Sequence, residues 1–245
     1  MEQRPRPARA TQTDLPRLVE GTRARGGLQV SAREEILERI RKATKDVVEK
    51  DPVKDVAVTW KYNQPTPLED VLETFVENIL DYKARITRTP ATGTPGAIVA
   101  ALKELGARTV VVPDGAPQAW VEAVSAAGMQ VVRDEQLSHQ QLNDIDAVLT
   151  GSAVSMAETG TICLDHAADQ GRRALTLVPD RHVCVVRAES VVSDVPEAVH
   201  RLKEAVVAGR PVTWISGGSA TSDIELSRVE GVHGPRQLYV VLEDG

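Results

Sequence analysis

Apolar residues recur at helical spacing in two segments of the first third of the chain. At the start of the first segment, Ser31 and Glu34 have the spacing of a capping box, which satisfies free backbone N–H groups at a helix start. The second segment begins with Thr66 and Pro67, which suit the cap and the first helical position. We therefore predict that residues 31–90 form a helical region packed on the rest of the molecule.

From about residue 90 the pattern changes to short apolar runs that alternate with helical segments, which is typical of a largely parallel sheet. The predicted strands are 109–112, 129–132, 146–149, 161–164, 174–178, 182–186, 212–215 and an apolar run after residue 235, and the predicted helices are 94–106, 117–128 and 196–208. The connection between 174–178 and 182–186 is too short for a parallel crossover, so these two strands should form an antiparallel hairpin. The predicted fold class is α/β, with an open, mixed and mostly parallel sheet and flanking helices.

These patterns divide the chain into three parts. Residues 1–30 begin with arginines and prolines, contain no apolar core of a signal peptide, and should form a disordered or extended tail. The helical region follows, and residues 91–245 should form the α/β domain. No run approaches the roughly 18 apolar residues of a membrane helix, so we expect no membrane span.

Charge and cysteine content exclude several classes of function. A formal charge of −6 and a pI near 5.5 provide no general basic field for nucleic acid. Cys163 and Cys184 are too few for an iron–sulfur cluster and do not indicate a secreted disulfide framework, so we expect a cytoplasmic protein. These cysteines could form a metal site together with His166 and His182. Such a site is disfavoured, because His182 and Cys184 would share a strand face but Cys163 and His166 would not. We expect no metal or other cofactor in this chain.

Polar residues and glycine gather in a predicted turn before strand 161–164. Glu158, Thr159, Gly160 and Thr161 could present backbone N–H groups and hydroxyls to an anion, and Glu158 could act as a general acid or base. The alternative is a tight turn whose threonines bond the local backbone.

A glycine-rich loop follows strand 212–215, at the kind of position where open α/β sheets bind ligands. Its glycines permit close approach of a ligand to the backbone, and its hydroxyls could donate hydrogen bonds. The candidate binding residues are Gly217, Gly218, Ser219, Thr221, Asp223 and Glu225. The loop matches neither a P-loop nor a dinucleotide motif, so no bound nucleotide is predicted. The alternative role of its acidic residues is to cap a turn.

A second polar loop, residues 231–235, contains His233. Histidine titrates close to neutral pH, so His233 is the first choice for a general acid or base. The alternative is a structural hydrogen-bonding histidine.

Four segments together resemble the LUD-domain family and, within it, the lactate utilization protein C group. They are 157–161, 179–182, 216–225 and 231–235, and the resemblance covers about residues 90–245. One departure is Gly218, where the family commonly has proline. The resemblance implies a fold like that of ribose-5-phosphate isomerases and CoA-transferases. It also implies a subunit without iron–sulfur clusters that acts with the iron–sulfur lactate utilization proteins A and B in the oxidation of L-lactate to pyruvate; which subunit removes the hydride or proton does not follow from the resemblance.

In this leading hypothesis the threonines and glycines of the two loops bind a small carboxylate or other anion, and Glu158 or His233 moves a proton. A second hypothesis is a free-standing enzyme or binding protein for a phosphosugar or an acyl-CoA, which rests on fold analogy. A third is a regulatory scaffold that docks through helices 32–50 and 67–82.

Overall fold

The computed structural model of the 245-residue chain describes residues 31–49, 51, 54, 64–221, 229–230 and 234–245. The chain divides into two units, Met1–Thr59 and Trp60–Gly245. In the first unit, helix α1 spans Ala32–Ala43. The Ser31 hydroxyl accepts a hydrogen bond from the Glu34 N–H, and the Glu34 carboxylate accepts one from the Ser31 N–H. The predicted capping box is therefore confirmed.

A six-stranded sheet forms the centre of the second unit, in the order β1-β12-β7-β4-β2-β3. All of its neighbouring strands run parallel. Its strands are β1 (Arg85–Pro90), β2 (Thr109–Val112), β3 (Gln130–Arg133), β4 (Ala147–Thr150), β7 (Arg181–Arg187) and β12 (Gln237–Asp244). The predicted α/β class with a largely parallel sheet is confirmed.

A second, four-stranded sheet has the order β8-β5-β6-β9. Its strands are β8 (Val191–Val192), β5 (Val154–Met156), β6 (Thr161–Leu164) and β9 (Thr213–Ile215). Strands β5 and β6 form an antiparallel hairpin, and β9 runs antiparallel to β6. A short antiparallel pair, β10 (Ala220–Thr221) with β11 (Val229–Glu230), follows β9 along the chain.

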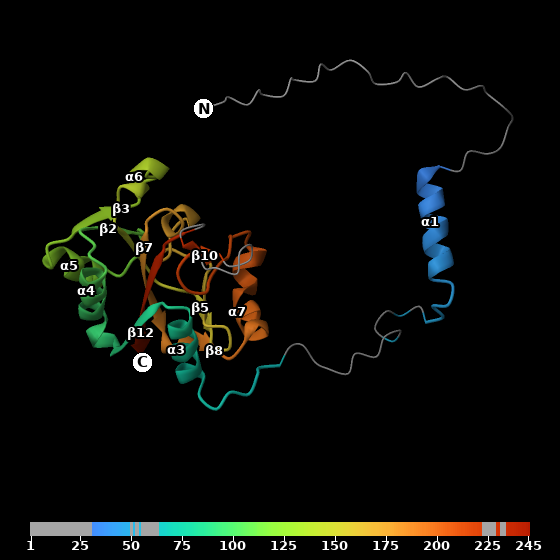
Figure 1. Cartoon of the computed structure of the whole chain (residues 1–245), viewed down its shortest axis with the longest axis horizontal. Helices are drawn as coiled ribbons and strands as arrows, with labels where there is room; N and C mark the ends of the chain where they lie inside the picture. Colours follow the sequence, from blue (N-terminus) through green and yellow to red (C-terminus); the bar gives the residue numbers. More distant parts are fainter. Residues whose placement is uncertain (1–30, 50, 52–53, 55–63, 222–228, 231–233) are drawn as a thin grey trace, which may run out of the picture. The chain divides into compact units, whose positions relative to one another are not determined.

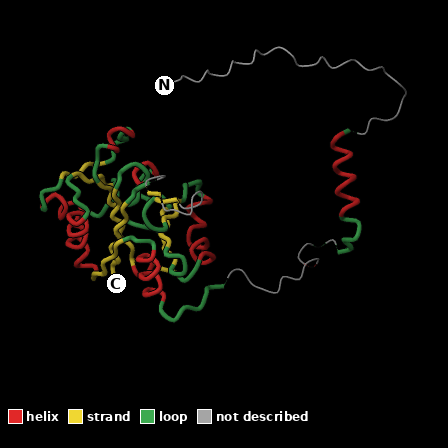
Figure 2. Tube along the Cα trace, in the orientation of Figure 1, coloured by secondary structure: helices red, strands yellow, loops and turns green. Residues whose placement is uncertain are grey.

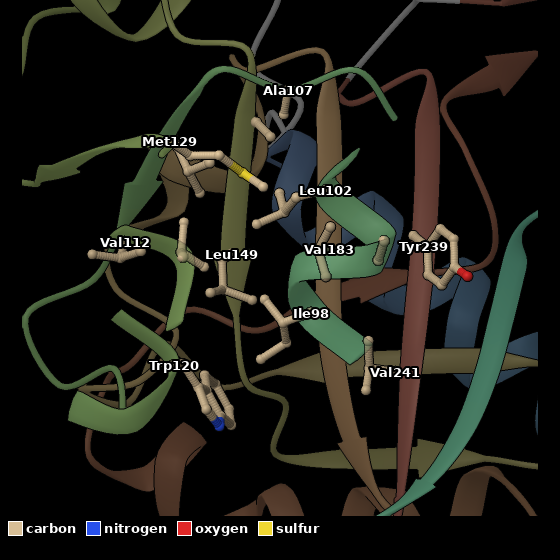
Figure 3. Close-up of a cluster of buried hydrophobic side chains, with 14 of the residues drawn as sticks. Ile98, Leu102, Ala107, Val112, Trp120, Met129, Leu149, Val183, Tyr239 and Val241 are labelled. Atoms are coloured by element: carbon tan, nitrogen blue, oxygen red, sulfur yellow. The ribbon is translucent and has the colours of Figure 1, made fainter. Parts of the chain in front are cut away.

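The helices of the second unit flank its two sheets (Figures 1 and 2). They are α3 (Val71–Asp81), α4 (Thr94–Glu104), α5 (Gln118–Ala126), α6 (His139–Asn143) and α7 (Val195–Val207), with 3-10 turns at Ala91–Gly93, Arg173–Thr176 and Ala188–Ser190. Helices α4 and α5 pack on one face, where Ile98, Leu102 and Trp120 meet Leu149 and other buried strand residues (Figure 3). Fully burying one such aliphatic side chain contributes roughly 1.5–3 kcal/mol.

The opposite face of the large sheet packs on α3 and on the four-stranded sheet. Phe75 and Ile79 of α3 share this core with Ile162 and Leu164 of β6. The far side of the four-stranded sheet packs on α7, where Met156 meets Leu202. The four-stranded sheet is therefore sandwiched between the large sheet and α7.

Two sequence predictions are wrong. Residues 174–178 do not pair with 182–186: Arg173–Thr176 is a 3-10 turn, and the second run lies within β7, a parallel strand between β12 and β4. The run 182–186 is buried throughout, because β7 is covered on both faces. The helix predicted to start at Pro67 begins at Val71, because the Asp70 carboxylate, not Thr66, accepts from the first free N–H groups.

Candidate functional site

The predicted polar turn connects β5 and β6 and lies against α3. Gly160 has φ +54°, a left-handed conformation that glycine adopts at little cost. A Cβ atom at this position would lie 2.9 Å from the backbone carbonyl carbon of Asn78. Glycine at position 160 therefore allows both the turn and its close packing on α3.

Hydrogen bonds from two other elements hold this turn in place. The Asn78 side-chain amide donates to the carbonyl oxygens of Ala157 at 2.8 Å and Glu158 at 3.2 Å. The Glu158 N–H donates to the carbonyl of Ser193, 3.0 Å away, just before α7. The backbone at Glu158 is thus positioned by α3 and by the start of α7, two partners that the local sequence does not reveal.

The carboxylate of Glu158 is exposed and lies near a second carboxylate, that of Asp194. The Thr66 hydroxyl lies 2.9 Å from Asp194 Oδ2 and 3.5 Å from Glu158 Oε2. The Thr66 N–H also donates to Asp194 Oδ2, at 2.8 Å. Since a hydroxyl has one proton, the shorter contact to Asp194 leaves Glu158 weakly engaged. Glu158 is therefore available to a ligand or a proton.

The two threonines of the turn differ in their hydrogen bonding. The hydroxyls of Thr161 and Ser216 share a hydrogen bond of 2.7 Å, which joins the turn to the glycine-rich loop. The Thr159 hydroxyl is buried and has no hydrogen-bond partner within the described part of the chain. Leaving a buried hydroxyl unpaired costs about 1–3 kcal/mol, which a bound ligand or water would recover.

The glycine-rich loop packs closely on the ends of two other elements. A Cβ atom at Gly217 would lie 2.7 Å from the Cβ of Tyr82, just after α3, and one at Gly218 would lie 2.3 Å from the Arg236 carbonyl oxygen. The Ser219 N–H donates to the carbonyl of Pro235 at 2.7 Å. These contacts bring the two loops of the sequence prediction side by side.

The loop lies at the amino edge of the large sheet. Arg236 directly precedes β12, and its guanidinium forms two hydrogen bonds, of 2.5 and 2.8 Å, with Asp180, which directly precedes β7. The Arg236 guanidinium lowers the pKa of the Asp180 carboxyl. The expectation that this loop lies at the usual ligand-binding, carboxyl edge is wrong, because β9 belongs to the four-stranded sheet and runs antiparallel to β6.

The structure brings the predicted turn residues next to the first residues of the predicted loop. Contacts through Thr161 and Ser216 link the Glu158–Thr161 turn to Gly217, Gly218 and Ser219. The backbone of Thr221 lies in β10. The predicted residues Asp223, Glu225 and His233 lie outside the described residues.

Of the four candidates for a metal site, His182 and Cys184 both contact the Thr150 hydroxyl, whereas Cys163 and His166 lie elsewhere. Cys163 packs against α7, whereas Cys184 packs in the core between the two sheets. The ring of His166 is hydrogen-bonded to the Gly171 carbonyl and the Thr213 hydroxyl. Among the described residues, no three His, Cys, Asp or Glu side chains are grouped to hold a metal ion. Burial raises the pKa of both thiols to about 12, which is typical of inert structural cysteines.

Comparison with known proteins extends these observations. A profile of the LUD domain matches residues 97–242. Lactate utilization protein C of Deinococcus radiodurans is 55% identical over 184 residues, which cover 74% of this chain and 84% of that protein. The Escherichia coli K12 protein named uncharacterized protein YkgG is 30% identical over 174 residues, 65% of this chain and 74% of that protein.

A solved structure shares the fold. The crystal structure of a DUF162 family protein from D. radiodurans matches with a TM-score of 0.63 and 49% identity, covering 73% of this chain and 100% of that chain. Within the described residues, no helix combines the length and the hydrophobicity needed to cross a bilayer. Since the domain profile spans more than half of the sequence and relatives match at this identity, the chain belongs to the LUD-domain family.

Proposed function

We propose that this chain acts in lactate utilization as a subunit without iron–sulfur clusters. In this role it supports the oxidation of L-lactate to pyruvate together with two iron–sulfur partners, the lactate utilization proteins A and B. Support comes from family membership and from the 55% identity to a protein named lactate utilization protein C. The two-cysteine content agrees with a division of labour in which the partners carry the clusters and the electrons.

The proposed site is the region where the Glu158 turn meets the glycine-rich loop. The observation that carries this assignment is the 2.7 Å hydrogen bond between Thr161 and Ser216, which places both polar segments against one another. Hydroxyl and backbone N–H groups would bind the substrate anion, and the unpaired hydroxyl of Thr159 is the first such donor. The proposed binding residues are Thr159, Gly160, Thr161, Gly217, Gly218, Ser219, Thr221, Asp223 and Glu225.

Glu158 and His233 are the proposed proton-transfer groups. Oxidation of lactate removes a proton from its hydroxyl group, and a positioned carboxylate or imidazole can accept that proton. Glu158 suits this task because its carboxylate is exposed and is held by one long contact, at 3.5 Å, from Thr66. General-base catalysis typically contributes about 10²–10⁴-fold to a rate.

The test is L-lactate oxidation with an artificial electron acceptor, comparing the iron–sulfur partners alone with the partners plus this chain. Turnover should require the chain, and Glu158→Gln should reduce it by about 10²-fold while the melting temperature is unchanged. Glu104→Gln is the matched control, because Glu104 is similarly exposed but lies on α4, across the sheet. Turnover that is indifferent to the chain would refute the proposed role. Full activity of Glu158→Gln would refute the role of Glu158 alone.

A further inference from the structure

The carboxyl edge of the large sheet, opposite the polar loops, is closed by the chain segment after β6. The N–H of Gly115, shortly after β2, donates to the carbonyl of Ala168 at 3.0 Å, and the N–H of Gly151, directly after β4, donates to the carbonyl of Asp169 at 3.0 Å. A Cβ atom at Gly151 would lie 2.3 Å from Asp169 Oδ2. Glycine at position 151 therefore lets the Asp169 carboxylate rest on the end of β4.

Strands β2 and β4 are neighbours, and the chain builds the sheet outward from them in opposite directions, to β3 on one side and to β7 and β12 on the other. Such a point, at the carboxyl ends of the strands, is where open α/β sheets bind ligands. Asp169 thus lies at the position that the topology marks for a binding site.

A cavity of about 280 Å³ opens beside Asp169, between the end of β4, the end of β7 and helix α7. Its polar lining includes Ser152, Asp165, Asp169, Gln170, Arg187 and Arg201. Pockets for drug-sized ligands typically measure about 300–1,000 Å³. The volume therefore suits a small metabolite better than a nucleotide or an acyl-CoA.

Arg187 and Asp169 lie next to each other in the lining of this cavity, and both have unused hydrogen-bonding capacity. Arg187 Nη2 lies 3.7 Å from Asp169 Oδ2, which is too long for a hydrogen bond. By contrast, the Arg172 guanidinium binds Asp134 with two bonds, of 2.6 and 2.9 Å. Within the described part of the chain, the ion pair with Asp169 is the one polar contact of the Arg187 side chain.

The Asp169 carboxylate is also poorly satisfied. The Gln170 side-chain amide donates one long hydrogen bond to Asp169 Oδ1, at 3.4 Å. Burial raises the pKa of this carboxyl, and the Asp169 N–H, Arg187 and Gln170 offset that effect only in part. A perturbed carboxyl in a cleft, next to a cation, is a common feature of binding and active sites.

The remaining charges around the cavity are better balanced. Asp165 pairs with Arg210 at 3.0 Å. Arg201 lies 3.6 Å from Glu197 and donates to the carbonyl of Glu189 at 3.1 Å. Arg187 and Asp169 are therefore the two groups of this cavity with the most to gain from a ligand.

We infer that this cavity binds a small 2-hydroxycarboxylate, whose carboxylate pairs with Arg187 and whose hydroxyl donates a hydrogen bond to Asp169. An acceptor group and a donor group on neighbouring carbons of the ligand match the adjacent guanidinium and carboxylate. The choice of a hydroxyl over an ammonium group as the donor rests on the proposed function in lactate utilization. The carboxylate and its neighbouring donor rest on the geometry of Arg187 and Asp169.

This site is separate from the polar loops. Arg187 ends β7, whereas Asp180, which binds Arg236 beside the glycine-rich loop, precedes the same strand. Strand β7 has seven residues, so its ends are about 20 Å apart at about 3.3 Å per residue. One small ligand cannot contact both places at once.

The test is calorimetric titration of the isolated full-length chain with L-lactate, propionate, L-alanine and inorganic phosphate. L-Lactate should bind saturably and at least tenfold more tightly than propionate, which lacks the hydroxyl. Arg187→Gln should weaken L-lactate binding at least tenfold, and Asp169→Ala, which removes the acceptor, should remove the preference for L-lactate over propionate. Arg85→Gln is the matched control, because Arg85 is 49% exposed and also holds one ion pair, against 53% for Arg187.

Three outcomes would overturn the inference. They are no saturable L-lactate binding, tighter binding of L-alanine or phosphate than of L-lactate, and unchanged affinity in folded Arg187→Gln. The exposed position of Arg187 allows this variant to fold, which circular dichroism would check. Binding to the isolated chain does not depend on the iron–sulfur partners, so failure of this inference and failure of the proposed function can be told apart.

Discussion

Mild acid should destabilise the α/β unit through one buried imidazole, that of His182. The residue lies on β7 and is 1% exposed, and its Nε2 atom lies 2.8 Å from the hydroxyl of Thr150. Burial lowers the pKa of His182 from 6.5 to about 4. Below pH 6.5 the unfolded chain therefore binds a proton that the folded chain does not, and the free energy of unfolding falls as the pH falls toward 4.

The size of this effect follows from the two pKa values. A pKa difference between about 6.5 and about 4 corresponds to about 3.4 kcal/mol when both states have titrated fully. Between pH 7.5 and 5.0 the expected loss is about 2 kcal/mol, because the folded state is still almost wholly neutral at pH 5. That is a large part of a total stability of about 5–15 kcal/mol.

The effect of His182 on stability between pH 7.5 and 5.0 can be separated from the effects of other ionisable groups. Burial raises the pKa of Asp169, so its protonation favours the folded state as the pH falls and opposes the effect of His182. The hydrogen bonds from Arg172 lower the pKa of Asp134, so the stability that this carboxylate contributes is lost as the pH falls below the usual carboxyl pKa of 3.8. The loss between pH 7.5 and 5.0 is therefore assigned to His182 by comparing the wild type with a variant that cannot titrate.

The assay is urea unfolding of wild type and His182→Gln at pH 5.0 to 7.5, followed by circular dichroism. Glutamine can keep a polar contact to Thr150 but has no proton to gain in this range. The wild type should lose about 2 kcal/mol and the variant much less. Independently of the variant, the NMR shifts of the His182 ring in folded wild type should show a neutral imidazole at pH 5. A ring that titrates near pH 6.5, or equal slopes for both proteins, would refute the reasoning.

Three further predictions concern stability and reactivity. Gly160→Ala should lower the free energy of unfolding by about 2 kcal/mol in urea unfolding, because φ is +54° and the new Cβ would lie 2.9 Å from Asn78; an unchanged midpoint would contradict the strained turn. Asp134→Asn should lower the free energy of unfolding by about 2–3 kcal/mol, because Asp134 is 7% exposed and forms two hydrogen bonds with Arg172. Glu35→Gln, in an exposed ion pair, should lower it by less than about 0.5 kcal/mol. Similar losses for both variants would contradict a stabilising role of the Asp134–Arg172 pair. Neither buried cysteine should react with iodoacetamide in the folded protein at pH 8, and both should react in urea, as intact-mass measurement would show; labelling of the folded protein would count against buried thiols.

Most elements of the α/β unit were predictable because their signals are local. Helix α4 starts at Thr94 followed by proline, and helix α7 starts after Asp194, whose side chain accepts from the N–H of Glu197. The short run 109–112 forms strand β2, as predicted, and its three valines are buried. In these segments composition and spacing agree with the three-dimensional environment, so the sequence was sufficient.

Errors arose where a distant partner decides the local structure. Thr66 has the right type and position for a helix cap, but Asp194, far along the chain, takes its hydrogen bonds. Strand β1 was not predicted, because it is an edge strand with a half-exposed pattern and few apolar residues. The run 161–164 was correctly predicted to be a strand, but its place in a separate sheet depends on its pairing with β5 and β9, and no local pattern specifies that pairing.

The same contrast between local and distant signals holds for the two candidate sites at the ends of the β5–β6 hairpin. The Glu158 turn lies at the turn end, and the cavity beside Arg187 and Asp169 lies at the open end. The turn end could be found from the sequence, because Glu158–Thr161 is contiguous and rich in polar groups. The open end could not, because Ser152, Asp169, Arg187 and Arg201 come from four segments and are ordinary residue types by themselves. The one local signal was Gly151 directly after a buried strand, which marks a close approach of other atoms to the backbone.

Electrostatics distinguishes the two ends more sharply than the sequence does. The turn end places the carboxylates of Glu158 and Asp194 near one hydroxyl, so an anion bound there needs hydroxyl and N–H donors that outweigh the repulsion from two carboxylates. The open end places Arg187 beside Asp169, a partly buried carboxyl whose pKa is raised by burial, and the Arg187 guanidinium can attract a carboxylate. If an anion binds at the open end, substitutions at Arg187 should change its affinity for the isolated chain, whereas substitutions at Glu158, at the other end, should leave that affinity unchanged. If substitutions at Thr161 and Ser216 change the affinity for the anion instead, then hydroxyl and backbone N–H donors outweigh the repulsion from the two nearby carboxylates. In that case the substrate lies at the turn.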